Sequence, residues 1–103
     1  MEFVDFRDLT IILGEEVLEK IRERHPEITM DQIRETLLDP LEVRRSRHKH
    51  GSELYYSHAF KKERFTCVVV KLNTADGNNY VETAYTSSKI KAGEVIFSKE
   101  MKG

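Results

Sequence analysis

The sequence has a single cysteine among its 103 residues, so no disulfide can form within the chain. That residue, Cys67, lies in the apolar segment FTCVVV, where a lone cysteine most often packs as a small hydrophobic side chain. No apolar run approaches the roughly 20 residues that a helix needs to cross a bilayer, which argues against a membrane-spanning helix. The first residues do not combine a basic segment with a long apolar one. We therefore expect no signal peptide and a cytoplasmic protein.

Several motifs that mark common enzyme classes are also missing. The sequence has no phosphate-cradling glycine loop, no GxSxG elbow and no Cys–His nucleophile signature. His48 and His50 are two residues apart and could bind a metal ion, with His58 and Cys67 as further possible ligands. However, the sequence contains neither the CxxC nor the HExxH spacing that is typical of zinc sites. HKHGS is better interpreted as a polar hairpin tip, and we expect neither a metal nor a cofactor.

Charge is distributed unevenly, although the net charge is only −1. Residues 1–42 hold 12 acidic and 5 basic side chains, whereas residues 43–103 hold 12 basic and 6 acidic ones. The densest basic segment is RRSRHKH at 44–50. Such a stripe suits a phosphate-bearing partner such as RNA. The alternative is a solvated hairpin whose charges face water or the acidic helices.

One helix is predicted to begin after Gly14. Leu18, Ile21 and His25 follow the helical spacing i, i+3, i+7 and should therefore lie on one face of this helix. Pro26 disfavours helical geometry at the residue before it, so the helix should end near His25.

A second helix has a clearer beginning. Thr29 and Gln32 have the spacing of a capping box, and Asp39-Pro40 ends the helical pattern. The short link between the two helices predicts a helical hairpin. Before them, one of the apolar segments EFVDF and LTIIL is predicted as an edge strand.

After Pro40 the apolar period changes from 3.6 to 2. LEVRRSR, ELYYSHAF, FTCVVVKL and YVETAYTS are predicted strands, separated by turn-forming segments, so they should meander antiparallel. SSKIKAGEVIF should turn at Gly93 and end in a short strand or loop. We predict one α+β domain over residues 1–103, with an N-terminal helical hairpin packed on one face of an antiparallel sheet of about four strands. The other face of the sheet should stay partly open.

His25 is the first candidate for chemistry, because it lies at the edge of the helix face that should be buried. A histidine can exchange a proton near neutral pH, as a general acid or base must. The alternative is that His25 only ends the helix and fills the corner beside Pro26.

The arginines after Pro40 are the second candidates. Guanidinium groups bind phosphate in fork geometry, so Arg44, Arg45 and Arg47 would suit a phosphodiester substrate. Strand alternation puts Arg45 and Arg47 on the face of Val43, and Arg44 on the other. The alternative is that they are edge charges that discourage strand pairing.

Aromatic and hydroxyl side chains on the later strands complete the set. Tyr55 and Tyr56 fall on opposite faces, so one should be core and the other could stack on a base. Lys71 ends an apolar strand, where it either reaches water or points into a cleft. Thr86 belongs to a cluster of hydroxyls and lysines, AYTSSKIKAG, which suits phosphate but is also ordinary turn material.

The order of these segments resembles a known nuclease group. VLEKIRERHPEIT, IRETLLDPLEVRRSR, ELYYSHAF, CVVVKL and VETAYTSSKIKAGE are similar to the phage- and mobile-element-associated members of the barnase–EndoU–colicin–RelE-like (BECR) nucleases. The match includes a His-Pro-Glu turn and a D-P-x-x-V-x-x-S pattern formed by Asp39, Pro40, Val43 and Ser46. It covers about residues 15–94.

The resemblance implies a BECR/RelE-like fold and metal-independent RNA cleavage, in which a ribose 2′-hydroxyl attacks the adjacent phosphorus. It implies His25 as acid/base and Arg44 at the phosphate, with Lys71 and Thr86 helping. Tyr56 and Arg47 would contact substrate, and Arg45 replaces Arg44 if the strand has no bulge. A toxin of this kind would also have an antitoxin or immunity protein as partner. The alternative is a non-catalytic domain of the same fold that binds RNA or a protein.

Overall fold

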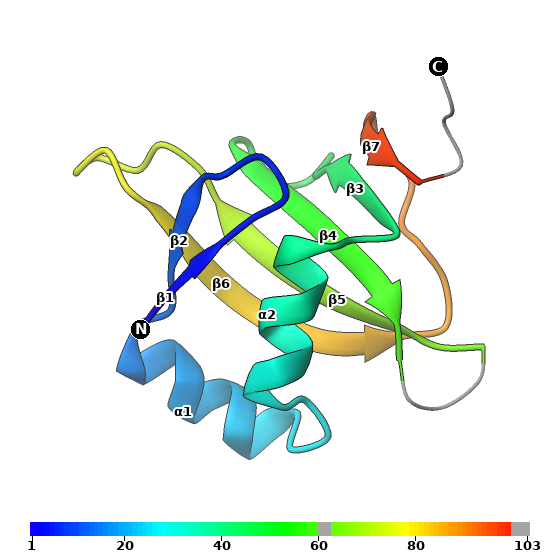
Figure 1. Ribbon diagram of the computed structural model, residues 1–103, viewed down its shortest axis with the longest axis horizontal. Coiled ribbons are helices and arrows are strands. Elements are labelled where there is room, and N and C mark those ends of the chain that lie inside the picture. Colours follow the sequence, from blue (N-terminus) through cyan, green and yellow to red (C-terminus); the bar gives the residue numbers. More distant parts are fainter. Residues whose placement is uncertain (60–62, 100–103) are drawn as a thin grey trace.

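The computed structural model describes residues 1–59 and 63–99, which form a curled β-sheet with two short helices (Figure 1). The seven strands of this sheet follow the order β1-β2-β6-β5-β4-β3-β7. All neighbouring strands are antiparallel except β2 and β6, which run parallel. The elements in chain order are β1 (Glu2–Val4), β2 (Thr10–Ile12), α1 (Glu15–Arg24), α2 (Met30–Leu38), β3 (Glu42–Arg45), β4 (Ser52–His58), β5 (Phe65–Lys71), β6 (Asn79–Ser87) and β7 (Val95–Ser98).

The predicted fold, a helical hairpin on an antiparallel sheet of about four strands, is wrong. The sheet has seven strands and is mixed, because β2 joins β6 by a parallel pairing. The four strands predicted after Pro40 are present as β3 to β6, but both N-terminal segments are strands and β7 extends the sheet beyond β3. The end of the predicted strand 53–60 and part of the turn 61–64 lie outside the described residues.

The two helices pack on different parts of the sheet rather than on each other. The helix α2 contacts β4 and β5 and also β1, which lies at the far edge of the sheet. A helix can meet both a central and an edge strand only if the sheet curls around it, and Figure 1 shows the β1–β2 hairpin folded toward α2. The backbone N–H of Phe6 also donates to the carbonyl of Leu37 at 2.9 Å.

The helix α1 follows the free edge of β6 instead. The strand β2 pairs with β6 at Asn79 and Tyr80, and within residues 1–59 and 63–99 no strand pairs with the later residues of β6 on that side. The helix α1 contacts β6, and Ile21 is its buried residue. This position brings the end of α1 to the last residues of β6.

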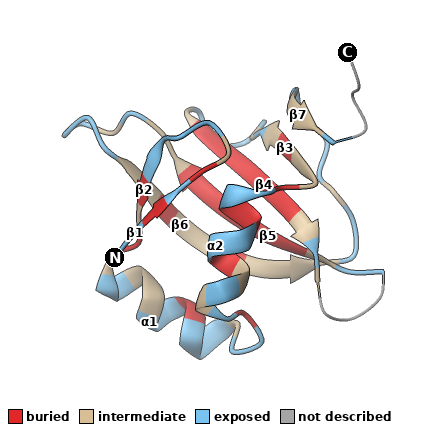
Figure 2. Ribbon diagram, viewed as in Figure 1, coloured by how far each residue is buried: buried red, intermediate tan, exposed pale blue. Residues whose placement is uncertain are grey.

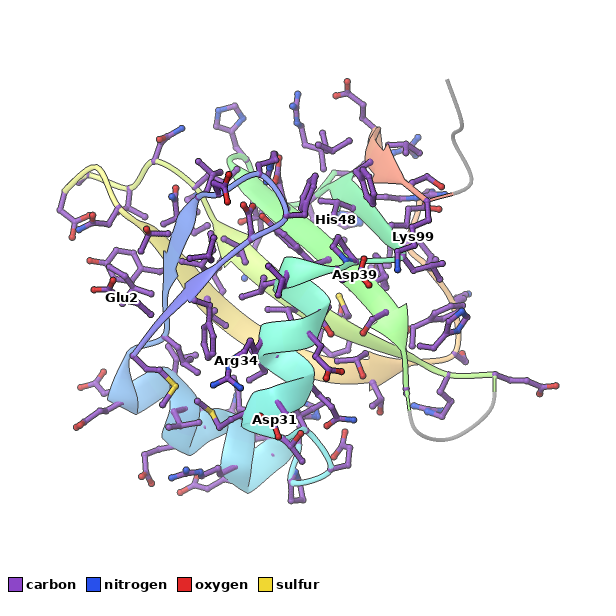
Figure 3. All side chains as sticks on the ribbon, viewed as in Figure 1. Glu2, Asp31, Arg34, Asp39, His48 and Lys99 are labelled. Atoms are coloured by element: carbon purple, nitrogen blue, oxygen red, sulfur yellow. The ribbon has the colours of Figure 1, made fainter. Side chains whose placement is uncertain are left out.

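The start of α2 agrees with the sequence. Thr29 Oγ1 accepts from the backbone N–H of Gln32 at 3.1 Å, and Gln32 Oε1 accepts from the N–H of Thr29 at 2.7 Å. The predicted capping box is confirmed. Further along, exposed ion pairs join Arg34 to Asp31 and Lys99 to Asp39, at 2.8 and 2.9 Å (Figure 3). The second of these ties the residue after β7 to the end of α2.

The sheet separates two apolar clusters, and Figure 2 shows the buried residues concentrated in β4 and β5. The larger cluster lies under α2 and includes Val43, Tyr55 and Val68. The smaller lies on the opposite face, with Leu54, Tyr56, Cys67 and Val69. We call that side the open face. It is partly covered by residues 88–93, whose Ile90 packs on the smaller cluster.

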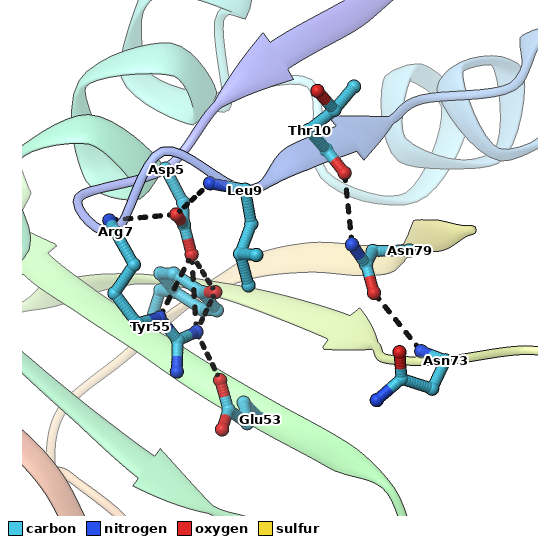
Figure 4. A network of polar contacts seen from close by, with 8 residues as sticks. All are labelled: Asp5, Arg7, Leu9, Thr10, Glu53, Tyr55, Asn73 and Asn79. Carbon is cyan, nitrogen blue, oxygen red and sulfur yellow. Dashed lines mark hydrogen bonds and ion pairs between the residues drawn. The ribbon is translucent and has the colours of Figure 1, made fainter. Parts of the chain in front are cut away.

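A polar network around the buried side chains of Asp5, Glu53 and Tyr55 fastens the β1–β2 hairpin to β4 (Figure 4). Asp5 accepts from Tyr55 Oη at 2.8 Å and from the Arg7 guanidinium at 3.1 Å, and Arg7 also donates to Glu53 at 2.6 Å. Burial alone would lower the pKa of Arg7, but the contacts with Glu53, Tyr55 and Asp5 raise it overall. Burial, with the hydrogen bond to Asp5, raises the pKa of Tyr55. Arg7 therefore stays charged and Tyr55 neutral.

Gly93 marks a close approach between residues 88–93 and β3. A Cβ added at Gly93 would clash with the backbone carbonyl oxygen of Arg45. We expect Gly93→Ala to lower the free energy of unfolding by about 1–3 kcal/mol, the usual cost of overpacking. Gly14→Ala is the matched control, since no described residue other than the chain neighbours of Gly14 has an atom within 4 Å of a Cβ placed there. Urea denaturation of both variants checks this, and equal midpoints would contradict it.

Candidate functional site

His25 lies at the C-terminal cap of α1, beside the end of β6. Its backbone N–H donates to the carbonyl of Ile21 at 2.7 Å, which completes the last turn. The imidazole is 35% exposed, and its ring centroid is 6.1 Å from that of Tyr85. The ring is therefore reachable from solvent and is not packed away in the core.

A chain of polar contacts starts at this ring. His25 Nδ1 lies 3.8 Å from Glu27 Oε2, and the same oxygen accepts a hydrogen bond from Thr86 Oγ1 at 3.2 Å. Arg64 donates to Thr86 Oγ1 at 3.3 Å. We call His25, Glu27, Arg64 and Thr86 the histidine cluster. It joins a proton-exchanging ring, a carboxylate, a hydroxyl and a guanidinium at one half-exposed edge.

A buried hydroxyl lies close to this cluster. Thr66 is the residue of β5 that pairs with Thr86. Its Oγ1 is the one buried side-chain polar atom without a hydrogen-bond partner among the described residues. Leaving such a group unpaired costs free energy, and an orphaned hydroxyl in a structure needs an explanation.

The two candidate arginines of β3 point to opposite faces. Arg44 pairs in register with Leu54 and lies on the open face, where its guanidinium bonds to Glu42 and to the carbonyl of Lys91. Arg45 lies on the same face as Val43, and its guanidinium is 3.0 Å from Glu94. Both guanidinium groups already have a carboxylate partner, and the structure brings neither into the histidine cluster.

Lys71 lies far from Thr86 along the sheet. Lys71 pairs with Tyr80 at one end of β6, whereas Thr86 pairs with Thr66 near the other end. Five residues of strand correspond to about 17 Å. Lys71 donates instead to the backbone carbonyl of His50, and it borders a second pocket with Arg45 and Glu53.

Tyr56 is fully buried on the open face. Its hydroxyl accepts a hydrogen bond from the backbone N–H of Lys91 at 3.1 Å. Burial, with lesser effects that include the Cys67 thiol, raises the pKa of Tyr56 to about 12. The ring leaves no surface on which a base could stack, so Tyr56 supports the sheet and anchors residues 88–93.

A pocket of about 640 Å³ opens between residues 46–49 and residues 89–92 on the open face. The lining residues that the structure describes include no Asp or Glu. We call it the basic pocket, because its rim includes Arg47, Lys49, Lys89 and Lys91, over a floor of Leu54, Val69, Tyr85 and Ile90.

Tyr85 connects the basic pocket to the histidine cluster. It lines the pocket, while its ring also neighbours His25, and Lys91 Nζ lies 5.5 Å from its centroid. Burial, with the neighbouring Cys67, raises the pKa of Tyr85, so its phenol stays neutral. Tyr85 pairs with Cys67 on the open face, whereas Thr86 pairs with Thr66 on the face of the helices, so the two sites lie on opposite faces of β6 and approach each other where His25 neighbours Tyr85.

Sequence reasoning identified His25 and Thr86, which the structure brings together, but missed Glu27 and Arg64. The motif His-Pro-Glu did carry a signal for Glu27, because a carboxylate two residues after His25 in a tight turn has to stay close to it. Arg64 comes directly before β5, and its approach to Thr86 depends on long-range pairing of β5 with β6.

Among residues 1–59 and 63–99, no group of three or more His, Cys, Asp or Glu side chains could hold a metal ion. In the same residues, neither helix has the length and apolar character needed to span a bilayer. Comparison with protein-family models, curated proteins and solved structures found no match to this chain.

Proposed function

We propose that the chain is a small metal-independent endoribonuclease whose reacting groups are in the histidine cluster. The observation that carries the proposal is the contact chain from His25 through Glu27 and Thr86 to Arg64 at a half-exposed edge. Acid/base groups and a phosphate-binding cation within contact of one another are what a transphosphorylation needs.

In the proposed reaction, the Glu27 carboxylate removes the proton of a ribose 2′-hydroxyl as that oxygen attacks the adjacent phosphorus. The bond from phosphorus to the 5′-oxygen breaks, and protonated His25 gives its proton to this leaving oxygen. Arg64 holds the phosphate oxygens in fork geometry, and Thr86 keeps Glu27 and Arg64 aligned. The products are a 2′,3′-cyclic phosphate and a 5′-hydroxyl.

This is the chemistry that the sequence resemblance to BECR nucleases implies, with a different set of cations. Arg44 and Lys71 are replaced by Arg64, because Arg44 bonds to Glu42 and Lys71 lies at the other end of β5. We further propose a cytoplasmic location, since the lone cysteine is a buried thiol. As a toxin, the chain would have an antitoxin or immunity protein as partner.

The direct test is incubation of the purified protein with end-labelled RNA in excess chelator. We expect cleavage that leaves 2′,3′-cyclic phosphate and 5′-hydroxyl ends, and no cleavage where the attacking ribose lacks its 2′-hydroxyl. Products with 3′-hydroxyl and 5′-phosphate ends, activity that requires added metal, or an inert protein would argue against the proposal.

The second candidate function is RNA binding without cleavage. The basic pocket favours it, because its cationic rim and apolar floor include no residue of the histidine cluster. This function predicts salt-sensitive RNA binding without any RNA cleavage. The His25→Ala variant should then bind RNA as tightly as the unchanged protein.

A further inference from the structure

We infer that the basic pocket binds one unpaired nucleobase together with its flanking phosphates, so that the RNA ligand is single-stranded at this position. The inference deepens the proposed function and rests on it for the identity of the ligand as RNA. It names the substrate class and a specificity-determining subsite beside the histidine cluster.

The first argument is the arrangement of charge around the pocket. Arg47 and Lys49 come from the turn after β3, whereas Lys89 and Lys91 come from the segment after β6. Cations that arrive from two separate segments suit two phosphates, one on each side of a bound base. Lys49 is partly neutralised by Glu82 at 3.3 Å, so Arg47 is the stronger anion ligand on its side.

The second argument is the chemistry of the floor. Leu54, Val69 and Ile90 offer an apolar surface, and Thr83 adds a hydroxyl. A volume of about 640 Å³ is within the range of pockets that hold a small organic ligand, of roughly 300–1,000 Å³. A planar base is apolar on its faces and polar at its edge, so it suits a floor of this kind below a basic rim.

The third argument excludes a duplex. In a double-stranded RNA the bases are paired and stacked, and a protein reaches mainly phosphates and 2′-hydroxyls. A duplex could contact the basic rim but could not place a base on the floor. Tyr85 belongs to both the floor and the surroundings of His25, so a single strand that leaves the pocket over Tyr85 reaches the edge of β6 where His25 lies.

The test uses a fluorescent single-stranded oligonucleotide in which every ribose is 2′-deoxy, so that it binds without being cleaved. Binding is followed by anisotropy at several salt concentrations, together with a duplex of the same sequence. We expect the single strand to bind at least roughly tenfold more tightly than the duplex, a difference of about 1.4 kcal/mol. Equal binding of the two forms would overturn the inference.

Thr83→Glu puts a carboxylate into the pocket and should weaken single-strand binding at least roughly tenfold. Thr10→Glu is the matched control for net charge, because Thr10 is exposed on β2. If Thr83→Glu fails to fold by circular dichroism, Arg47→Ala and Lys89→Ala replace it. Each should reduce the slope of log affinity against log salt by about 0.7, and Lys20→Ala on α1 should not.

The outcomes separate this inference from the proposed function. Single-strand binding that Thr83→Glu abolishes, in a protein that cleaves no RNA, supports the pocket and contradicts the endoribonuclease. RNA cleavage whose KM is unchanged in Thr83→Glu overturns the pocket and leaves the endoribonuclease standing.

Discussion

His25→Ala is expected to lower the rate of RNA cleavage by about 10²–10⁴-fold, the usual contribution of a general acid or base. The protein should remain folded, because the imidazole is partly exposed and the cap of α1 is made by the backbone N–H of His25, which alanine retains. Affinity for the 2′-deoxy oligonucleotide should change little, since the imidazole does not line the basic pocket. The effect should therefore fall on kcat rather than on binding.

The matched control is His58→Ala. His58 is an exposed histidine at the end of β4 whose ring stacks on Phe65, with centroids 5.7 Å apart. It makes no contact with the histidine cluster that the structure records, so its replacement should leave the rate within about twofold. Cleavage that persists in His25→Ala, or that falls equally in His58→Ala, would contradict the role of His25.

Glu27→Gln separates the two acid/base groups. The amide keeps the size of the side chain and its ability to accept from Thr86, but it cannot take a proton. We expect a rate loss comparable with that of His25→Ala. The double variant should lose much less than the product of the two single losses, because the effects of groups that act as a unit are not additive. Glu23→Gln, on the exposed face of α1, is the control.

The extent to which the sequence predicts this fold depends on how local each signal is. The capping box of α2 and the continuous apolar run of β5 are local, and each element forms where the pattern places it. The strands β1 and β2 have three residues each, and β2 pairs with β6 near residue 79. A pairing across so much chain leaves no local periodicity, which explains the incorrect helix-on-sheet arrangement.

In the candidate site, too, the sequence predicts local contacts but not those that depend on long-range strand pairing, with one exception. Glu27 follows His25 in the chain, whereas Arg64 and Thr86 meet them only after the sheet has formed. The separation of Lys71 from Thr86, however, follows from the sequence alone. In an antiparallel meander the end of β5 lies beside the start of β6, so two residues at the ends of consecutive strands fall at opposite edges.

Asp5→Ala is expected to lower the free energy of unfolding by about 2–4 kcal/mol, because a buried carboxylate that serves several donors is lost and each donor left unpaired costs about 1–3 kcal/mol. Asp5 is 1% exposed, and its carboxylate accepts from the backbone N–H groups of Arg7 and Leu9 at 2.8 and 2.9 Å. It also accepts from Tyr55 Oη and pairs with the Arg7 guanidinium. Alanine accepts from none of these donors, and the buried Tyr55 hydroxyl would lose its acceptor away from water.

Two further variants show whether the loss of stability in Asp5→Ala comes from the burial of this carboxylate. Asp31→Ala removes an exposed carboxylate whose partner, Arg34, is three residues along α2, so it should cost no more than about 0.5 kcal/mol. Tyr55→Phe removes one donor to Asp5 and leaves the carboxylate with its other partners, so about 1–2 kcal/mol is expected. Urea denaturation gives all three values from the midpoints, provided that the slopes agree. Equal midpoints for Asp5→Ala and Asp31→Ala would contradict the role of the network.

The Asp5 network also bears on how activity measurements should be interpreted. It fastens the β1–β2 hairpin to β4, and β2 leads directly into α1, which carries His25 at its end. A domain of this size is stable by only about 5–15 kcal/mol, so Asp5→Ala removes a large part of the margin. Cleavage lost in Asp5→Ala should therefore return on cooling or under stabilising osmolyte as the folded fraction recovers, whereas cleavage lost in His25→Ala should not.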